Sequence, residues 1–422
     1  MEIRVISTEI IKPFSSTPEH LRSYKLSPMD QYSSDFYFPF VYFYSGASKN
    51  TAENSDHLKK SLSKTLTYYY PFAGRVKDDF SVCCDDYGAS FIEAKVAGDM
   101  SEFIKQKDVE LLEQLRPYDA EEMSTAEVNL AVQVNYFDCG GVAVCVSFRH
   151  VIADASAAAY FVKNWAAVAC GGNDIKDVIF DSTSIFPSQD GSGISKTNHR
   201  AIRTMSKETV TKWLVFDNSK VAALQEKIGG RPTRYETLLA LMWGAMIDAK
   251  EEIDESNPTQ FAAIIPVNLR KKMNPPLPEK CIGNAVALGM TYWPEKEKGD
   301  YKKIVCRARE VMSMVDDYAK TGIKNGWMNC IRNEAVRDKK CTSTRLFTFS
   351  SMCRLPLYET DFGWGKPVWF SISERMNVDT FVPLDTSDGK GIEVMVGLSK
   401  EDMANLEQHP AILAYANNIK VK

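Results

Sequence analysis

Val142-Ala-Val-Cys-Val-Ser-Phe-Arg-His-Val-Ile-Ala-Asp-Ala-Ser-Ala-Ala-Ala159 changes character at His150. The residues before His150 are mostly apolar and predict a buried strand over Val142–Phe148. The residues after it are small and predict a helix that runs to about Ala169. A histidine at the carboxyl end of a strand, followed by small side chains, leaves room for a substrate where α/β proteins usually bind one. His150 is therefore the first candidate site residue.

His150-Val-Ile-Ala-Asp154 combines a candidate base with a carboxylate. Imidazole, with its near-neutral pKa, is the side chain best suited to take a proton from an alcohol at physiological pH. Asp154 could orient the ring or could merely fix the loop. Since the chain has five histidines, such a spacing arises by chance in about a quarter of comparable chains. The motif alone leaves a helix-start histidine without chemistry as an equal alternative.

The rest of the chain is also expected to mix strands and helices. A Cys-Gly-Gly turn predicts a hairpin between the strand that ends at His150 and one before it, at 128–137. Further strands are expected at 1–11, 80–84, 91–96, 213–216, 261–269, 345–352 and 368–373, and helices at 58–69, 235–249 and 302–333. Residues 171–207 are rich in Gly, Ser, Asp and Thr and read as a linker.

Composition limits the class of protein. The 422 residues are too many for one ordinary core and suggest two domains or one unusually large one. The 25% of charged residues and the net charge of −4 are typical of a soluble protein without affinity for nucleic acid or anionic lipid. The longest apolar run, Leu238–Ile247, is far shorter than the roughly 18 to 20 residues of a membrane span. We therefore expect a cytoplasmic protein without membrane or nucleic-acid partners.

Metal and disulfide chemistry are not indicated. The ten cysteines contain no C-x-x-C pair and are expected to be reduced, mostly buried thiols. The other histidines, at positions 20, 57, 199 and 409, are scattered, so no metal site is predicted.

Asp361-Phe-Gly-Trp-Gly365 is the second and more specific signal. Ordinary amino-acid usage would produce this string in about one chain in ten thousand of this length. Two glycines around Trp364 indicate a turn where backbone amides approach another group or where a large ring is clamped. A purely structural turn with Trp364 as core packing is the alternative, and both interpretations can hold together.

Together the two motifs resemble those of the BAHD acyltransferases of plant specialised metabolism. The resemblance covers essentially the whole chain in the expected order, and within the family it is closest to the group of vinorine synthase and salutaridinol acetyltransferase. Further matching segments are Tyr24-Lys-Leu-Ser-Pro-Met-Asp30, Tyr70-Pro-Phe-Ala-Gly-Arg75, Val267-Asn-Leu-Arg270, Asn274-Pro-Pro-Leu-Pro278 and Gly283-Asn284.

The resemblance implies an α/β fold of two chloramphenicol-acetyltransferase-like domains with a solvent channel between them. Residues 1–185 would form the N-terminal domain, completed by about 361–385. Residues 186–208 would be a crossover linker, and 209–422 the C-terminal domain. The family's proteins incline us to expect a monomer.

The same resemblance implies roles for the motif residues. His150 would be the general base in the channel, reached by the donor from one face and by the acceptor from the other. Asp154 would point away from the substrate and pair with Arg270. Asn284 would line the channel or help to form the oxyanion site.

The second motif would contribute the remaining residues of the site. Asp361 is grouped with the catalytic residues, although its implied role is structural, and Gly363 and Gly365 would support its turn. The region of Trp364 would lie on the oxyanion or acceptor side. Ala155 stands where many members have Gly, which puts the acceptor in doubt more than the catalysis.

The implied reaction is transfer of an acyl group from coenzyme A, with acetyl favoured, to a hydroxyl of an alkaloid, terpenoid or phenolic alcohol. No cofactor would be bound, since acyl-CoA is a co-substrate. Its phosphates could meet a local group of lysines at positions 271, 272, 280 and 366, although surface lysines are more often simply solvated.

Three other functions remain open at this stage. An N-acyltransferase acting on an amine would use the same chemistry. A non-catalytic binding protein on the same fold is a second alternative. A serine hydrolase is a third, but G-x-S-x-G is absent, and Ser61-Leu-Ser-Lys64 lies on an amphipathic helix where we expect it to be exposed surface.

Overall fold

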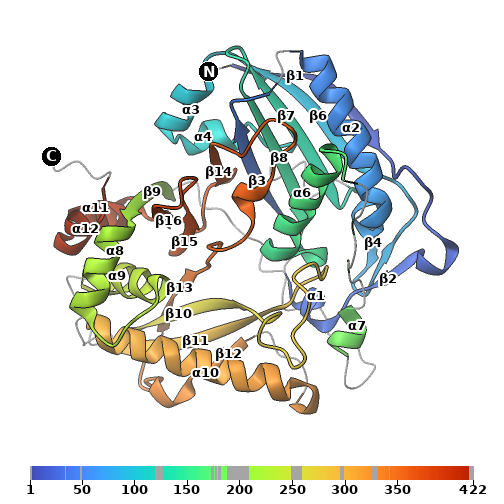
Figure 1. The fold of residues 1–422 in the computed structure, drawn as a ribbon. Coiled ribbons are helices and arrows are strands. Elements are labelled where there is room, and N and C mark those ends of the chain that lie inside the picture. Colours follow the sequence, from blue (N-terminus) through green and yellow to red (C-terminus); the bar gives the residue numbers. More distant parts are fainter. Residues whose placement is uncertain are drawn as a thin grey trace.

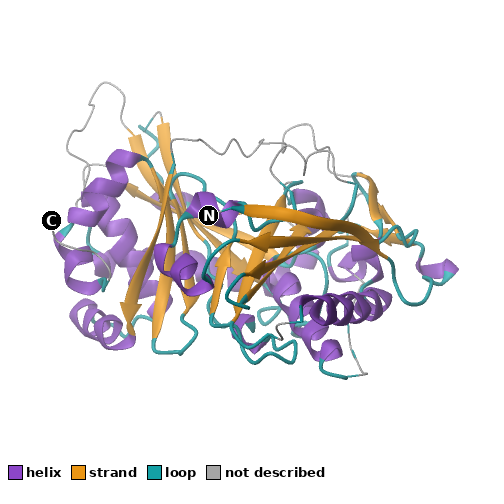
Figure 2. Ribbon diagram, turned by 90° about the horizontal axis from the view of Figure 1, so that it is seen from above, coloured by secondary structure: helices purple, strands orange, loops and turns teal. Residues whose placement is uncertain are grey.

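The structure is a computed structural model that describes residues 2–33, 35–47, 50–118, 127–172, 175, 178, 182–187, 209–248, 259–294, 299–325, 330–341 and 343–417. Two large sheets with helices packed against them dominate the described chain (Figures 1 and 2). The predicted α/β fold class is therefore confirmed.

The first sheet has, in the described residues, six strands in the order β1-β6-β7-β8-β3-β14. All neighbours are antiparallel except β6 and β7. Its strands are β1 (Ile3–Ile11), β6 (Ala89–Val96), β7 (Leu130–Phe137), β8 (Val142–Arg149), β3 (Tyr37–Tyr44) and β14 (Trp369–Ile372). Its helices are α2 (Thr51–Tyr68), α3 (Met100–Gln106), α4 (Val109–Glu113) and α6 (Ala155–Ala169).

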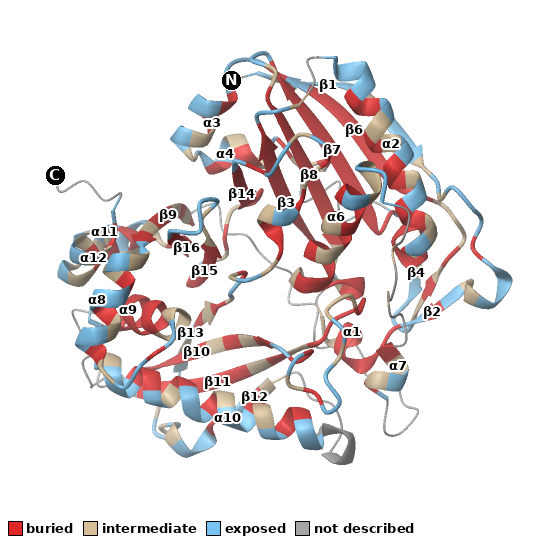
Figure 3. Ribbon diagram, in the orientation of Figure 1, coloured by how far each residue is buried: buried red, intermediate tan, exposed pale blue. Residues whose placement is uncertain are grey.

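Helices cover both faces of this sheet. Phe161 of α6 packs on Phe148, at 5.6 Å between ring centroids. Phe103 of α3 packs on Phe43 at 5.8 Å. Phe43 points to the opposite face from Phe148, because side chains alternate along a strand and Phe148 pairs with Phe38. β3 is consequently buried throughout, and β8 is buried as far as Phe148 (Figure 3).

The second sheet has, in the described residues, seven strands in the order β12-β11-β10-β13-β15-β16-β9. The helices of this half share one apolar core with it. The strands are β12 (Cys330–Arg332), β11 (Val286–Pro294), β10 (Thr259–Asn268), β13 (Ser343–Phe349), β15 (Thr380–Asp385), β16 (Gly391–Leu398) and β9 (Val210–Asp217). The helices are α8 (Asn218–Ile228), α9 (Arg234–Asp248), α10 (Tyr301–Asn325), α11 (Lys400–Gln408) and α12 (Pro410–Tyr415).

Small elements complete the described fold. A three-stranded sheet joins β2 (Ser23–Lys25), β5 (Ser81–Cys83) and β4 (Arg75–Asp78). The short helices are α1 (Pro28–Tyr32) and α7 (Ser182–Ile185), and the 3-10 turns are η1 (Glu19–Leu21), η2 (Tyr70–Ala73), η3 (His150–Ile152), η5 (Glu334–Val336) and η6 (Leu357–Glu359).

The two sheets are connected in two ways: one strand from the second half of the chain joins the first sheet, and side chains form hydrogen bonds between the sheets. β14 lies at the edge of the first sheet although β13 and β15, its neighbours in sequence, belong to the second. Of the segment 361–385, then, β14 joins the first sheet and β15 does not. Glu393 of β16 is buried, where it accepts hydrogen bonds from Lys107 and, at 2.9 Å, from Nε1 of Trp369. Residues 188–208, most of the predicted linker, lie outside the described residues.

Several sequence expectations need correction. The strands that were not anticipated are β2, β3, β4, β11, β12, β15 and β16, and the helix expected at 302–333 ends at Asn325, before β12. Most cysteines are not buried: Cys84, Cys145 and Cys281 are, whereas Cys139, Cys170 and Cys306 are exposed.

No helix in the described part of the chain is both long and apolar enough to cross a bilayer.

Candidate active site

His150 begins η3, directly after β8. Its backbone N–H donates to the carbonyl of Phe36 at 2.7 Å. Its half-buried ring lies against the rings of Phe36 and Phe38, with centroid distances of 4.9 and 5.0 Å. The segment that leads into β3 therefore holds the histidine on one side.

Asp154 is the N-cap of α6, and its Oδ1 accepts the backbone N–H of Ala157 at 2.9 Å. Its Oδ2 accepts from Nη1 of Arg270 at 2.7 Å and from the N–H of Ala285 at 3.0 Å. Both carboxylate oxygens are thus directed at the loop and at the second half of the chain. This geometry fits the predicted pairing with Arg270.

Arg270 follows β10 and joins the two halves of the chain around His150. Its side chain is only 1% exposed and that of Asp154 only 3%. Its Nη2 donates to the carbonyls of Cys281 at 2.9 Å and Gly283 at 3.1 Å. Burial opposes ionisation of Asp154, but the charge and hydrogen bonds of Arg270 outweigh it and lower the pKa of the carboxyl.

The loop that Arg270 holds lies beside the His150 segment. Ala153 and Gly283 form a parallel β-bridge. Asn284 donates from Nδ2 to the backbone carbonyl of His150 at 2.8 Å, and from the same nitrogen to Asp30 at 3.1 Å. Because an amide nitrogen carries two hydrogens, these bonds occupy Nδ2. Asn284 therefore lies next to His150, but its amide is not available as the oxyanion donor expected from the sequence.

Asp361 organises the turn of the second motif. Its Oδ1 accepts the backbone N–H groups of Gly363 at 2.8 Å and Gly365 at 2.9 Å. Both glycines have left-handed φ values, 91° and 83°, which side chains other than glycine rarely adopt. The structure gives Asp361 a local structural contact, far from His150.

Trp364 lies at the opposite end of the first sheet from His150. Its ring packs on Tyr44 at 5.6 Å, and Tyr44 pairs with Val142, the first residue of β8. His150 follows the last residue of β8, and seven steps of about 3.3 Å put roughly 23 Å between those ends. The expectation that Trp364 serves the oxyanion or acceptor side is thus corrected: the register of β3 and β8 keeps it away.

Three of the four predicted lysines have surroundings that the structure describes. Lys271 is exposed and pairs with Glu279 at 2.6 Å, and Lys272 pairs with Asp316. Both follow Arg270, whereas Lys366 is exposed beside the turn of Trp364. The binding of the donor's phosphates by these lysines therefore stays a prediction.

The alternative chemistries find no support in the described residues. Ser61 is buried, contrary to expectation; its hydroxyl donates to backbone carbonyls of its own helix and accepts from Nε1 of Trp165 at 3.0 Å. Lys64 is exposed, so the pair does not form a nucleophile and base. Among the described residues, no group of three or more His, Cys, Asp or Glu side chains is arranged to hold a metal ion.

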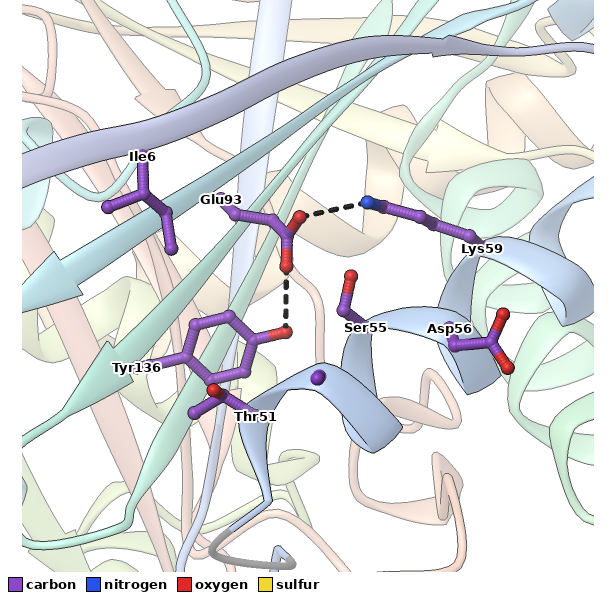
Figure 4. Close-up of a pocket in the computed structure, with 8 residues that line it drawn as sticks. Ile6, Thr51, Ser55, Asp56, Lys59, Glu93 and Tyr136 are labelled. Atoms are coloured by element: carbon purple, nitrogen blue, oxygen red, sulfur yellow. Dashed lines mark hydrogen bonds and ion pairs between the residues drawn. The ribbon is translucent and has the colours of Figure 1, made fainter.

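A cavity of about 410 Å³ lies on another part of the first sheet, between β1, β6, β7 and α2, and Figure 4 shows residues that line it. Glu93 accepts from Lys59 at 2.8 Å, from Ser7 at 2.7 Å and from the hydroxyl of Tyr136 at 3.4 Å. Burial opposes ionisation of Glu93, but Lys59 and the hydroxyl donors lower its pKa. Glu93, Lys59 and Tyr136 of this cavity pair with one another, and none of them lies beside His150.

Sequence reasoning missed two residues that hold His150 or its neighbours. Phe36 gave no signal, since a backbone carbonyl can belong to any residue. Asp30 stands in a segment already matched to the family, and Ser27-Pro-Met-Asp30 has the spacing of a capping box. That spacing indicates a helix start and nothing of the contact with Asn284.

Comparisons with known proteins agree with the fold. A family model described as the transferase family matches residues 1–413. Epi-neemfruitin B synthase of Melia azedarach is 47% identical, and limonoid 21-O-acetyltransferase of Citrus sinensis 45%, each over 99% of both chains. Salutaridinol 7-O-acetyltransferase of Papaver somniferum is 34% identical over 96% of this chain and 97% of its own.

The solved structure of vinorine synthase superposes with a TM-score of 0.81, at 29% identity over 99% of both chains. The fold is that of an acyltransferase. The chain belongs to the transferase family, the BAHD acyltransferases, so the resemblance read from its motifs is confirmed.

We expect Asp154→Ala to lower the free energy of unfolding by about 3–5 kcal/mol, because it leaves the Arg270 guanidinium buried without its counter-ion. Urea unfolding followed by circular dichroism measures this loss. Asp56→Ala is the matched control, since it breaks an exposed pair with Lys60 and should cost about 0–1 kcal/mol. An equal loss in the two variants would contradict the assignment.

Acid should narrow the difference in stability between the wild type and Asp154→Asn. Folding lowers the pKa of Asp154, so the unfolded chain binds its proton first. The resulting stabilisation is present above the unfolded pKa of about 3.9 and is lost as pH falls through the lower folded pKa. Urea unfolding at neutral pH and below pH 4 measures the difference in the free energy of unfolding between the two proteins at each pH. A gap that stays constant or widens on acidification would count against this linkage.

Gly365→Ala should destabilise the protein by about 1–2 kcal/mol, because alanine is strained at a φ of 83° while its methyl would meet open space. Since the turn is remote from His150, kcat/KM of the folded enzyme should stay within about threefold. The exposed neighbour Lys366 supplies the control, and Lys366→Ala should change neither quantity. A large fall in kcat/KM for either variant would show that this turn takes part in catalysis.

Proposed function

We propose that the chain acetylates a hydroxyl group of a plant specialised metabolite, with acetyl-CoA as the donor and His150 as the general base. Three relatives named as limonoid O-acetyltransferases are 44–45% identical to it, against 34% for salutaridinol 7-O-acetyltransferase. We therefore favour a limonoid-like terpenoid alcohol as the acceptor.

The observation that carries the proposal is the placement of His150. Its half-buried ring stands where the end of β8 meets the loop that follows Arg270. The backbone on either side of the ring is tied, through its N–H to Phe36 and through its carbonyl to Asn284. A base held in this way is placed for proton transfer before the substrates bind, which is the geometry that general base catalysis needs.

The reaction then follows in two steps. In the first step His150 takes the proton of the acceptor hydroxyl while the hydroxyl oxygen attacks the carbonyl carbon of the thioester. This attack forms a carbon–oxygen bond and an oxyanion. The oxyanion collapses, the carbon–sulfur bond breaks, and the coenzyme A thiolate leaves with the proton that the imidazolium returns. No acyl-enzyme forms, because holding the two substrates together supplies much of the rate enhancement.

We also infer that a single chain suffices for activity, as a cytoplasmic monomer. His150 comes from the first half of the chain and its partners Arg270 and Asn284 from the second, so the described site needs no residue from another copy. Size-exclusion chromatography with light scattering measures the mass. Activity confined to a dimer would contradict this inference.

The purified chain should release thiol from acetyl-CoA when a limonoid alcohol is present, and mass spectrometry should find the acetylated product. Amines offered in the same panel test N-acylation, and the relatives' names favour the alcohols. Binding of acceptors without thiol release would favour a non-catalytic binding protein.

We expect His150→Ala to lower kcat by about 10²–10⁴-fold, because general base catalysis contributes an effect of this size. Its thermal unfolding should be close to that of the wild type, since the ring is only half-buried. His20→Ala, which removes an exposed imidazole, should retain full activity. Turnover of His150→Ala within tenfold of the wild type would remove His150 from the mechanism.

A further inference from the structure

Asp30 lies at the start of the five-residue helix α1, where it forms a capping box with Ser27. Its Oδ2 accepts from the backbone N–H of Ser27 at 2.9 Å and from the Ser27 hydroxyl at 2.7 Å. Helix capping thus accounts for one carboxylate oxygen. Since the side chain is fully buried, its other oxygen also needs a donor.

That other oxygen is satisfied from the second half of the chain. Oδ1 of Asp30 accepts the backbone N–H of Asn284 at 2.6 Å and Nδ2 of the same residue at 3.1 Å. The two residues are 254 positions apart. The carboxylate therefore fixes both the backbone and the side-chain amide of Asn284, which capping of a short helix does not require.

Asn284 passes this constraint to His150, because its Nδ2 also donates to the His150 carbonyl at 2.8 Å. A flipped amide would turn its oxygen toward two acceptors, the carboxylate of Asp30 and the carbonyl of His150. These two acceptors thus select the amide orientation that holds His150.

Gly283 allows the loop to approach Asp30 this closely. Its φ is 89°, and a Cβ there would lie 3.0 Å from Oδ1 of Asp30 and 3.3 Å from the hydroxyl of Tyr24. The same residue bridges to Ala153. Backbone geometry and side-chain bonding therefore both bring the loop against the residues after β8.

We propose that Asp30 is a positioning residue for His150 and acts through Asn284 to fix the backbone from which the imidazole projects. This inference rests on the proposed function. The contact is separate from the bonds of Asp154, which reach Arg270, Ala157 and Ala285. A base misplaced by about 1 Å loses on the order of 10²-fold in rate, so a second tie on the same residue has a catalytic consequence.

The test compares kcat and KM for acetyl transfer in Asp30→Ala, Asn284→Ala and the double variant. We expect kcat to fall about 10²-fold in each, with both KM values within about threefold. The double variant should be no slower than either single variant, because all three variants break the same chain of hydrogen bonds from Asp30 through Asn284 to His150. Asp30→Asn keeps an oxygen that can face Asn284 and should recover much of kcat.

Two further variants distinguish a loss of positioning from a loss of folding. Ser27→Ala removes a capping partner of Asp30 without touching Asn284, and should lower the thermal midpoint while kcat stays within about threefold. In His150→Ala, adding Asp30→Ala should not slow the residual rate further. A further fall by the factor seen in the wild type, or an unchanged kcat in Asp30→Ala and Asn284→Ala, would overturn the inference while leaving the proposed function intact.

An NMR measurement, which needs no catalytic turnover, tests the positioning role of Asp30 even if the proposed function is wrong. The chain has five histidines, so carbon-13 labelling of their rings gives a small set of NMR signals, and His150→Ala identifies the signal of His150. Asp30→Ala and Asn284→Ala should shift or broaden that signal, and Ser27→Ala should not. If the wild type releases no thiol with any acceptor, an unshifted signal still rejects the positioning role and a shifted one supports it.

Discussion

The buried ion pair of Asp154 and Arg270 is the interaction on which the arrangement around His150 depends. Removing two charges from water is costly, and the cost is offset only where geometry and additional hydrogen bonds are good. Here the carboxylate has two backbone donors besides Arg270, and the guanidinium has two carbonyl acceptors besides Asp154. Because the partners come from different halves of the chain, the pair can form only when the loop after β10 docks beside His150.

This constraint explains why the site draws on both halves of the fold. His150 follows a strand of the first sheet, whereas Arg270 and Asn284 follow and precede neighbouring strands of the second. The Asp30–Asn284 contact repeats the same joining of halves by separate bonds. Chemistry by a lone imidazole demands accurate placement of the ring, and these two contacts supply it from outside the strand that carries the ring.

The sequence could predict the strand, the histidine and the helix around residues 142–169, since the apolar run and the small residues that follow it act locally. The pairing with Arg270 came from family resemblance and not from any spacing. β3 was missed because Tyr37–Tyr44 is buried on both faces and lacks alternation, and because Pro39 argues against a central strand. Trp364 was misplaced because its distance from His150 depends on the register of β3 with β8, which motif spacing does not carry.

A crystal structure with coenzyme A and an acceptor alcohol tests the central claim most directly. We predict that the acceptor hydroxyl lies about 2.6–3.2 Å from a ring nitrogen of His150, with the coenzyme A sulfur approaching the same ring. Ligands bound away from this ring, in the cavity around Glu93 or beside the turn of Trp364, would contradict it.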